Sequence, residues 1–425
     1  MQDDLVKKMA DFEVLLGYYT SRVICHPLVP PEHVYFSLTN RCNLRCKMCG
    51  VSKDSTPEDY ELPTEKVKDI IMQIKEMGIN HIIFSGGEPL LRKDLVEIVR
   101  FAHENNIKMV DLITNGTMLD DVIIKELAEA GLNYIGISID GLSQASSKIR
   151  GPGVFEKVVG NIDNLNKYKS KYGKRSPALG INFTIMGENV NDILPMIDLA
   201  RSIKCFFISF QPVLFNNTKM FVNRKNALWP QTGQINKLRN VIKELLRLKK
   251  EPNEVRIFTD EDVLNSLPDY FLGRRPKEDF KCYEAIKRIV ITCAGQLWSC
   301  QGILGDLNKN TLSQIWYSGK TKKVRQDIKK CKRHCLQDCV YFPSDILKIA
   351  KSITRANFLS LSNWKNEPQA RLINKIDSYI SILTENKKAK RNILEKISYN
   401  YILENECRKL IKAKKYFLNK YTASC

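Results

Sequence analysis

Short apolar runs alternate with amphipathic stretches between residues 33 and 215, and this alternation restricts the fold more than any other feature. Stretches such as "EKVKDIIMQIKEM" carry apolar residues at three- and four-residue spacing, which is typical of helices that bury one face. Strands that alternate with helices form parallel sheets. We therefore predict an α/β fold, a partial (β/α)6 TIM-like barrel. Its strands are expected at residues 34–39, 81–85, 108–114, 134–139, 179–185 and 206–212.

Three cysteines follow the first expected strand directly, in the stretch "SLTNRCNLRCKMCG". In α/β barrels the active site lies on the loops after the strands, so Cys42, Cys46 and Cys49 stand where an active site belongs. Closed zinc sites and ferredoxin-type clusters take four protein ligands. Cys25 is the only sequence neighbour that could complete such a set, which makes a zinc or electron-transfer protein a poor fit. Three ligands alone leave one metal position open for chemistry.

A second motif, "SGGEP", follows the second expected strand. Two glycines let the backbone approach a ligand without obstruction by side chains. Glu88 supplies a carboxylate for a cationic group. By itself this motif also fits an ordinary strand-to-helix turn. One strand and helix after a three-cysteine loop, it indicates a ligand site.

Together with "TNGT" at 114–117 and "SIDG" at 138–141, these motifs resemble the radical S-adenosylmethionine (radical SAM) superfamily over roughly residues 33–215. The resemblance implies a [4Fe–4S] cluster with three irons held by thiolates and the fourth chelated by S-adenosylmethionine. One electron from the reduced cluster then gives a 5′-deoxyadenosyl radical, which abstracts a hydrogen atom from the substrate. The cofactor carries this chemistry, while the protein supplies position and seclusion.

The resemblance also implies which residues contact S-adenosylmethionine. The expected contacts are Met48 near the adenine, Gly86, Gly87 and Glu88 at the amino group, Ser138 and Asp140 at the ribose and carboxylate, and Asn115 and Arg150 as further candidates. Ordinary structural roles are open to the same residues. Ser138 can cap a turn, Asp140 can pair with a surface lysine, and Met48 can fill the core.

Six further cysteines lie between Lys281 and Cys339. The runs "RIVIT" and "LWSC" flank a turn at Gly295 and predict a β-hairpin, which would bring Cys282 and Cys300 together. Three more cysteines, at four-residue spacing, would share one helical face if a helix persists there. They are Cys331, Cys335 and Cys339. Zinc accepts such ligands as well, so the ligand set does not choose the metal.

The order of Cys282, Gly295 and Cys300, followed by "LGDL", "TLSQIW" and a terminal cysteine group, resembles the SPASM/twitch extension of radical SAM enzymes. That extension holds one or two auxiliary [4Fe–4S] clusters. The full pattern needs a further cysteine soon after the group, and none appears until Cys407. One auxiliary cluster is therefore expected, with Cys282, Cys300 and two of the terminal three as ligands. Cys293 is open to a role as ligand, spare thiol or hydrogen-atom donor.

The chain divides into five expected segments. They are an N-terminal helical extension at 1–32, the radical SAM core at 33–215, a linker and helical segment at 216–280, a small cysteine-rich hairpin and helix domain for the auxiliary cluster at 281–342, and a basic α-helical C-terminal tail at 343–425. The net charge of +20 indicates an acidic partner or membrane surface. The tail's lysines and apolar residues fit such a contact, and packing on the barrel is the slightly favoured alternative. Nucleic acid is not expected, because no RNA-binding module is recognisable.

No secretory signal or spanning segment is recognisable, so we expect a cytoplasmic protein whose thirteen cysteines serve as metal ligands. We expect a radical SAM dehydrogenase or epimerase that acts on a polar, sugar-like small molecule. The alternative is a maturase of a ribosomal peptide or protein, although the 41 residues before Cys42 are few for the recognition domain that such maturases often carry. Either enzyme requires a reductant such as flavodoxin or ferredoxin.

Overall fold

The computed structural model describes residues 14–51, 60–173, 176–214, 228–251, 255–274, 281–332, 335–336, 341–342 and 378. Its main feature is a ten-stranded sheet of order β11-β10-β9-β1-β2-β3-β4-β5-β6-β7. Cys339 and the basic tail, apart from residue 378, lie outside the described residues, as does the start of the N-terminal extension.

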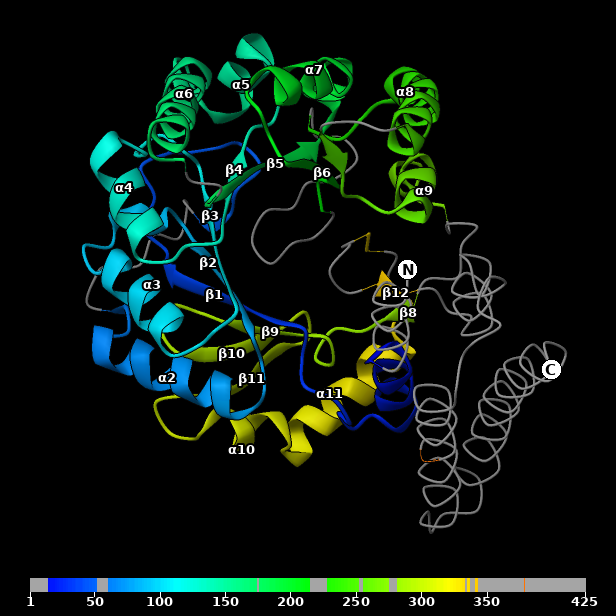
Figure 1. Cartoon of the computed structure of the whole chain (residues 1–425). Coiled ribbons are helices and arrows are strands. Elements are labelled where there is room, and N and C mark those ends of the chain that lie inside the picture. The colour runs from blue at the N-terminus through cyan, green and yellow to red at the C-terminus, as the bar shows by residue number, and fades with distance from the viewer. Residues whose placement is uncertain are drawn as a thin grey trace, which may run out of the picture.

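The six strands predicted from the sequence are confirmed, each with ends within one residue of the expected range. They are β1 (His33–Thr39), β2 (His81–Gly86), β3 (Met109–Thr114), β4 (Tyr134–Ser138), β5 (Ala178–Ile185) and β6 (Phe207–Pro212). Consecutive strands pair in parallel. Figure 1 shows them as an open arc with helices on its outer side, which confirms the partial barrel.

The outer helices form because their apolar residues recur at helical spacing and face the sheet. In α3 (Leu95–Glu104), for example, the buried residues are Leu95, Ile98, Val99 and Ala102. The other helices of this layer are α2 (Thr64–Glu76), α4 (Asp121–Glu129), α5 (Ser143–Arg150), α6 (Val154–Tyr172) and α7 (Pro195–Ser202), with short 3-10 turns at η3 (Pro89–Leu91) and η4 (Gly187–Asp192). Among the described helices, none combines the length and apolar character needed to cross a membrane.

Each strand turns alternate residues toward the helices and toward the concave side of the arc. In β1, Val34, Phe36 and Leu38 are fully buried in the core shared with the helices. The residues between them face the concave side, where Tyr35 Oη donates to Ser85 Oγ at 2.8 Å. The concave side is therefore lined with polar groups close to the ends of the strands.

The alternation continues beyond residue 215, where the sequence indicated only a linker and a helical segment. Helix α8 (Thr232–Lys250) is followed by β7 (Arg256–Ile257), which pairs in parallel with β6, and then by α9 (Glu261–Phe271). Strand β7 is only two residues long, too short to produce a recognisable apolar run. These elements extend the open arc at its far edge (Figure 1).

The predicted hairpin is present, and it joins the barrel. Strands β9 (Arg288–Ile291) and β10 (Gln296–Ser299) are antiparallel, and β11 (Gly302–Asp306) adds a third strand. Strand β9 also pairs in parallel with β1, from His33 opposite Arg288 to Phe36 opposite Ile291. Helices α10 (Leu312–Trp316) and α11 (Gly319–Lys330) follow, and β8 (Lys281–Cys282) pairs with β12 (Tyr341–Phe342). The ten-stranded sheet thus runs from the barrel into the hairpin that leads to Cys300, while Cys282 lies in the separate two-stranded sheet of β8 and β12.

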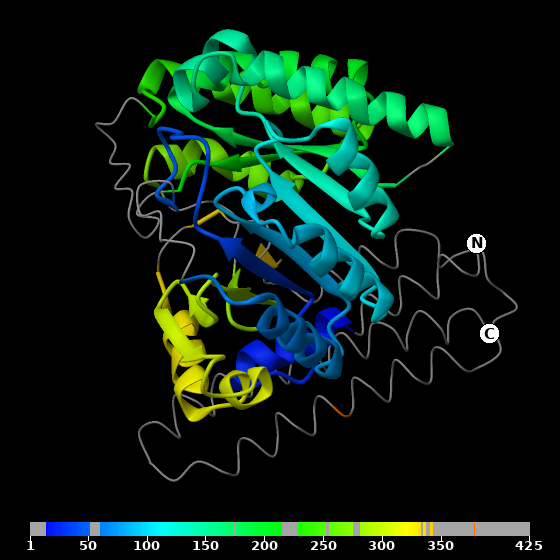
Figure 2. The same cartoon turned by 90° about the vertical axis from the view of Figure 1, so that its left-hand side faces the viewer.

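A helix at residues 14–24, blue in Figures 1 and 2, packs against this second region beside the yellow helix α11. Arg22 Nε donates to the carbonyl oxygen of Cys282 at 2.9 Å, and its guanidinium lies over the Tyr283 ring. Lys329 Nζ donates to the Val23 carbonyl at 2.6 Å. The N-terminal extension therefore fastens the strand that carries Cys282.

Candidate cluster and cofactor site

The three cysteines after β1 lie on one loop, and their thiols are near enough to affect one another's pKa. Cys46 is buried, and Cys42 and Cys49 are half-buried. Burial raises the pKa of Cys46 to about 11, and the thiols of Cys49 and Cys42 add to the rise. Burial also raises the pKa of Cys42, with Glu88 and Cys49 contributing in the same direction. Three thiols held this close fit thiolates whose negative charge a metal centre balances.

The glycines of "SGGEP" bring the second loop against the backbone of the cysteine loop. Gly87 N donates to the Thr39 carbonyl and Glu88 N donates to the Arg41 carbonyl, both at 2.7 Å. A Cβ on Gly86 would lie 2.1 Å from the Thr39 oxygen, and a Cβ on Gly87 would lie 2.1 Å from the Arg41 oxygen. Any side chain at either position would push the two loops apart. The motif therefore holds the cysteine loop in addition to any contact with a ligand.

The Glu88 side chain is fully buried and bonded within the chain. Its carboxylate accepts hydrogen bonds from Thr114 Oγ1 at 2.7 Å, the Asn115 amide at 2.8 Å and the Leu90 amide at 3.2 Å. Burial raises its pKa, and these hydrogen bonds oppose the rise. The carboxylate thus fixes the "TNGT" turn. Its expected contact with the amino group of S-adenosylmethionine stays a prediction.

We expect Glu88→Gln to lower the free energy of unfolding by about 1–3 kcal/mol, because the amide turns a donor toward one of three buried donors. Binding of S-adenosylmethionine should weaken as well, because the turn that carries Asn115 loses its anchor. Denaturant titration and calorimetry measure the two effects. Glu97→Gln on the surface of α3 is the control and should change neither. Wild-type stability and affinity in Glu88→Gln would contradict this role.

The "TNGT" turn contacts the first cysteine. Asn115 Nδ2 lies 3.9 Å from Cys42 Sγ and donates to Asn43 Oδ1 at 2.8 Å. Asn43 Nδ2 in turn donates to Thr117 Oγ1 at 2.9 Å. Asn115, expected from the resemblance as a cofactor contact, therefore lies beside the cysteine loop.

A buried ion pair lies beside the second cysteine. Arg150 Nη2 is 2.6 Å from Asp140 Oδ2, with side-chain exposures of 8% and 0%. Arg150 Nη1 lies 3.9 Å from Cys46 Sγ. Arg150 Nε is buried and has no hydrogen-bond partner among the described residues. Asp140 therefore pairs with a buried arginine that also lies beside the second cysteine.

Ser138 and Met48 were both expected to contact S-adenosylmethionine. Ser138 ends β4 opposite Asn182 of β5, half-buried. Met48 is half-buried and packs against the apolar core. Neither contact tests a role toward S-adenosylmethionine.

Four cysteines of the second region also come together. Burial raises the pKa of Cys282 to about 12, and the thiols of Cys300 and Cys335 add to the rise. Cys300 is exposed at the surface, but desolvation of its thiol by neighbouring groups raises its pKa to about 12, with Glu284, Cys335 and Cys331 contributing. Cys293 is buried in the turn at the opposite end of β10 from Cys300, and its carbonyl accepts from the Leu62 amide. The four thiols therefore gather without Cys293.

The terminal cysteines were expected to share one face of a helix. This expectation is wrong for those that the structure describes. Helix α11 ends at Lys330, and Cys331 has an extended backbone at the helix end. Cys331 and Cys335 are exposed, and Cys339 lies outside the described residues. Cys282 was expected to meet Cys300 across the hairpin. It lies instead on β8, which pairs with β12 and is not a strand of the hairpin.

No group of three or more His, Cys, Asp or Glu side chains in the described ranges is arranged to hold a single metal ion. A [4Fe–4S] cluster, in contrast, takes thiolates that each bind a different iron. The donors gathered at both sites are thiols, which suit iron–sulfur clusters.

Sequence reasoning missed Arg92, which supports the start of the cysteine loop. Its Nη1 donates to the carbonyls of Leu38 and Leu62 at 3.2 and 3.0 Å, and its Nη2 lies 2.6 Å from Asp94 Oδ2. A lone arginine three residues after the proline of "SGGEP" carried no recognisable signal.

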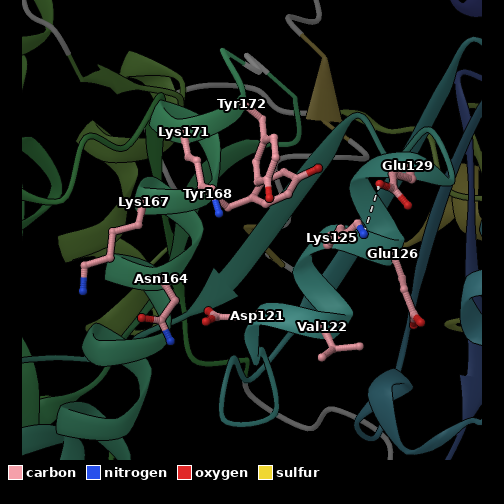
Figure 3. Close-up of a pocket in the computed structure, with 10 residues that line it drawn as sticks. All are labelled: Asp121, Val122, Lys125, Glu126, Glu129, Asn164, Lys167, Tyr168, Lys171 and Tyr172. Carbon is pink, nitrogen blue, oxygen red and sulfur yellow. Dashed lines mark ion pairs between the residues drawn. The ribbon is translucent and has the colours of Figure 1, made fainter.

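A groove of about 520 Å³ lies between α4 and α6, on the outer layer of helices. Figure 3 shows its lining, which includes the paired rings of Tyr168 and Tyr172 and the ion pair of Lys125 with Glu129. None of the residues expected from the sequence to bind a metal or cofactor lines it.

Comparison with known proteins covers both cysteine regions. Residues 36–200 match the family model of the Radical SAM superfamily, and residues 282–340 match that of SPASM, an iron–sulfur cluster-binding domain. These two ranges contain every cysteine expected to bind a cluster.

Curated relatives match over different lengths. Fe-coproporphyrin III synthase of Methanosarcina barkeri is 36% identical over 179 residues, which cover 41% of this chain and 43% of that protein. PqqA peptide cyclase of Rhizobium meliloti is 26% identical over 307 residues, covering 68% of this chain and 74% of that protein. The chain thus spans less than half of the first relative.

The solved structure of anSMEcpe with bound AdoMet shares the fold, with a TM-score of 0.52 and 20% identity over 81% of this chain and 98% of that one.

Proposed function

We propose that the chain is a radical SAM maturase that modifies a peptide or a protein, because residues 36–200 match the Radical SAM superfamily and residues 282–340 match SPASM. The observation that carries this proposal is the length of the match to PqqA peptide cyclase, 68% of this chain. The match to Fe-coproporphyrin III synthase covers 41%. The anSMEcpe structure has also been solved with a peptide bound, named Cp18Cys. These findings favour the peptide alternative over a dehydrogenase or epimerase of a sugar-like molecule.

The radical SAM and SPASM domains imply S-adenosylmethionine and [4Fe–4S] clusters. When bound, the cofactor supplies a 5′-deoxyadenosyl radical. We assign Cys42, Cys46 and Cys49 as ligands of the first cluster. The Arg150 guanidinium, whose Nη1 lies 3.9 Å from Cys46 Sγ, is of the type that binds a ligand carboxylate. Gly86, Gly87 and Asn115 hold the loops that surround this position.

We assign Cys282, Cys300, Cys331 and Cys335 as ligands of one auxiliary cluster, because their thiols gather in the structure. Cys339 remains a candidate. The carbonyl contact of Arg22 and the pairing of β8 with β12 hold Cys282 in position. The pairing of β9 with β1 joins the hairpin that leads to Cys300 to the strand that precedes the first cysteine loop.

A peptide substrate fits the polar lining of the concave side. Tyr35 and Ser85 form a hydrogen-bonded pair there, and Asn182 and Ser209 lie on the same face of neighbouring strands. Hydroxyl and amide groups both donate and accept hydrogen bonds, as peptide groups require. We propose that these residues bind the segment of the substrate that reacts.

The thirteen cysteines suit the reducing cytosol, where a flavodoxin or ferredoxin would supply the electron. We propose that location and that class of reductant for the reaction.

The test uses peptides encoded by short reading frames beside the gene, with anaerobic enzyme, S-adenosylmethionine and dithionite. We expect a peptide to increase 5′-deoxyadenosine formation and to change mass. The Cys42, Cys46 and Cys49 triple alanine variant is the negative control. Stimulation by sugar-like compounds and by no peptide would overturn the proposal in favour of the small-molecule enzyme.

A further inference from the structure

Two opposite charges are buried beside one thiol of the first cluster site. The Arg150 guanidinium lies between Asp140 Oδ2, at 2.6 Å from Nη2, and Cys46 Sγ, at 3.9 Å from Nη1. Asp140 is fully buried, and the Arg150 side chain is 8% exposed. Solvent therefore screens neither charge well. Besides the effect of burial, Arg150 lowers the pKa of the Cys46 thiol and Asp140 raises it.

Two hydrogen bonds to backbone carbonyls hold the chain around this ion pair, and neither uses the charged group of Asp140 or Arg150. Lys47 N donates to the Ile149 carbonyl at 2.9 Å, which ties the cysteine loop to the end of α5. Asn189 Nδ2 donates to the Asp140 carbonyl at 3.0 Å. Side-chain replacements at Arg150 and Asp140 leave these two anchors in place. The charges can therefore be changed while the loop keeps its main supports.

Reduction adds one negative charge to a cluster. A nearby cation stabilises the reduced form and raises the reduction potential, while a nearby anion lowers it. We propose that the Asp140–Arg150 pair sets the reduction potential of the cluster held by Cys42, Cys46 and Cys49, with Arg150 raising it and Asp140 lowering it. This inference rests on the radical SAM assignment and not on the identity of the substrate.

The opposite signs distinguish this role from a structural one. Arg150→Gln should make the potential more negative, and Asp140→Asn should make it more positive. Each change should alter the reduction equilibrium constant about tenfold, which is about 59 mV for a one-electron couple. The double variant removes both charges and should return close to the wild-type potential. Damage to the loop would move both single variants in the same direction.

The measurement is a redox titration of the whole anaerobic protein, followed by electron paramagnetic resonance without S-adenosylmethionine. The first cluster is recognised separately, because its signal changes when S-adenosylmethionine is added. Arg45→Gln is the matched control, because Arg45 is exposed and donates to the carbonyls of Cys42 and Leu44 in the same loop. Its replacement should shift the potential much less, since solvent screens its charge.

If the Arg150→Gln protein loses iron, the Arg150→Lys protein is titrated in its place and compared with wild type and Asp140→Asn. Arg150→Lys keeps the charge and should keep the wild-type potential, while Asp140→Asn should still raise it. The proposal is overturned if fully loaded single variants shift in the same direction, or if neither shifts more than Arg45→Gln. Neither result bears on the proposed peptide substrate, which the deoxyadenosine assay tests independently.

Discussion

Replacement of Cys42, Cys46 and Cys49 by alanine is expected to remove about four irons and four sulfides per chain and to abolish cleavage of S-adenosylmethionine. The reason is geometric, because these three thiols gather on one loop beside the buried Arg150. Iron and sulfide analysis of anaerobically isolated protein, with an assay for 5′-deoxyadenosine, measures both effects.

Cys205→Ala is the matched control for this triple variant. Cys205 is also buried, and burial raises the pKa of its thiol to about 12. Within the described part of the chain, Lys169 is the one charged group that shifts this pKa, and it lowers it. Its replacement should leave iron content and cleavage unchanged. Unchanged iron in the triple variant would disprove the assignment of the loop as a cluster site.

Replacement of Cys282 and Cys300 together is expected to remove another four or so irons while cleavage of S-adenosylmethionine is partly kept. These thiols gather with Cys331 and Cys335 in the second region, apart from the first cysteine loop. Modification of a substrate should be lost, because the second site is then incomplete. Iron analysis and the deoxyadenosine assay, run without and with substrate, measure the separation of the two functions.

Cys293→Ala is the control for the double variant, because Cys293 is buried in the same hairpin at the opposite end of β10. It should keep all its iron. A double variant that retains the full iron content, or a wild-type protein isolated with stoichiometric zinc, would exclude an auxiliary cluster on these ligands.

The strands and the cysteine loop were predictable because their signals are local. An apolar run such as 34–39 and the thiols that follow it lie within a few residues of each other. The pairing of β9 with β1 was not predictable, because it joins His33 to Arg288 across most of the chain. Periodicity shows that a strand exists and carries no information about a distant partner.

The site was predictable by residue type and less so by orientation. The motif "SGGEP" marks Glu88, but the turn of its carboxylate toward Thr114 and Asn115 depends on how β2 and β3 pack together. The ion pair of Asp140 with Arg150 depends likewise on where α5 ends relative to β4. The four-residue spacing of Cys331 and Cys335 suggested a helix. Helix α11 instead ends at Lys330, one residue before Cys331.

The pairing of β1 with both β2 and β9 has a consequence for how the chain folds. A fragment that stops before residue 281 would leave one side of β1 as a bare edge, with unpaired amide and carbonyl groups open to other chains. During synthesis, one edge of β1 stays unpaired until β9, about 250 residues later, has been made. Bringing the two strands together closes a long chain segment, which is entropically costly. The first cysteine loop therefore gains its final support only when the last strands of the sheet arrive. The sequence shows a boundary between the two regions, but the first region completes its sheet only with a strand from the second.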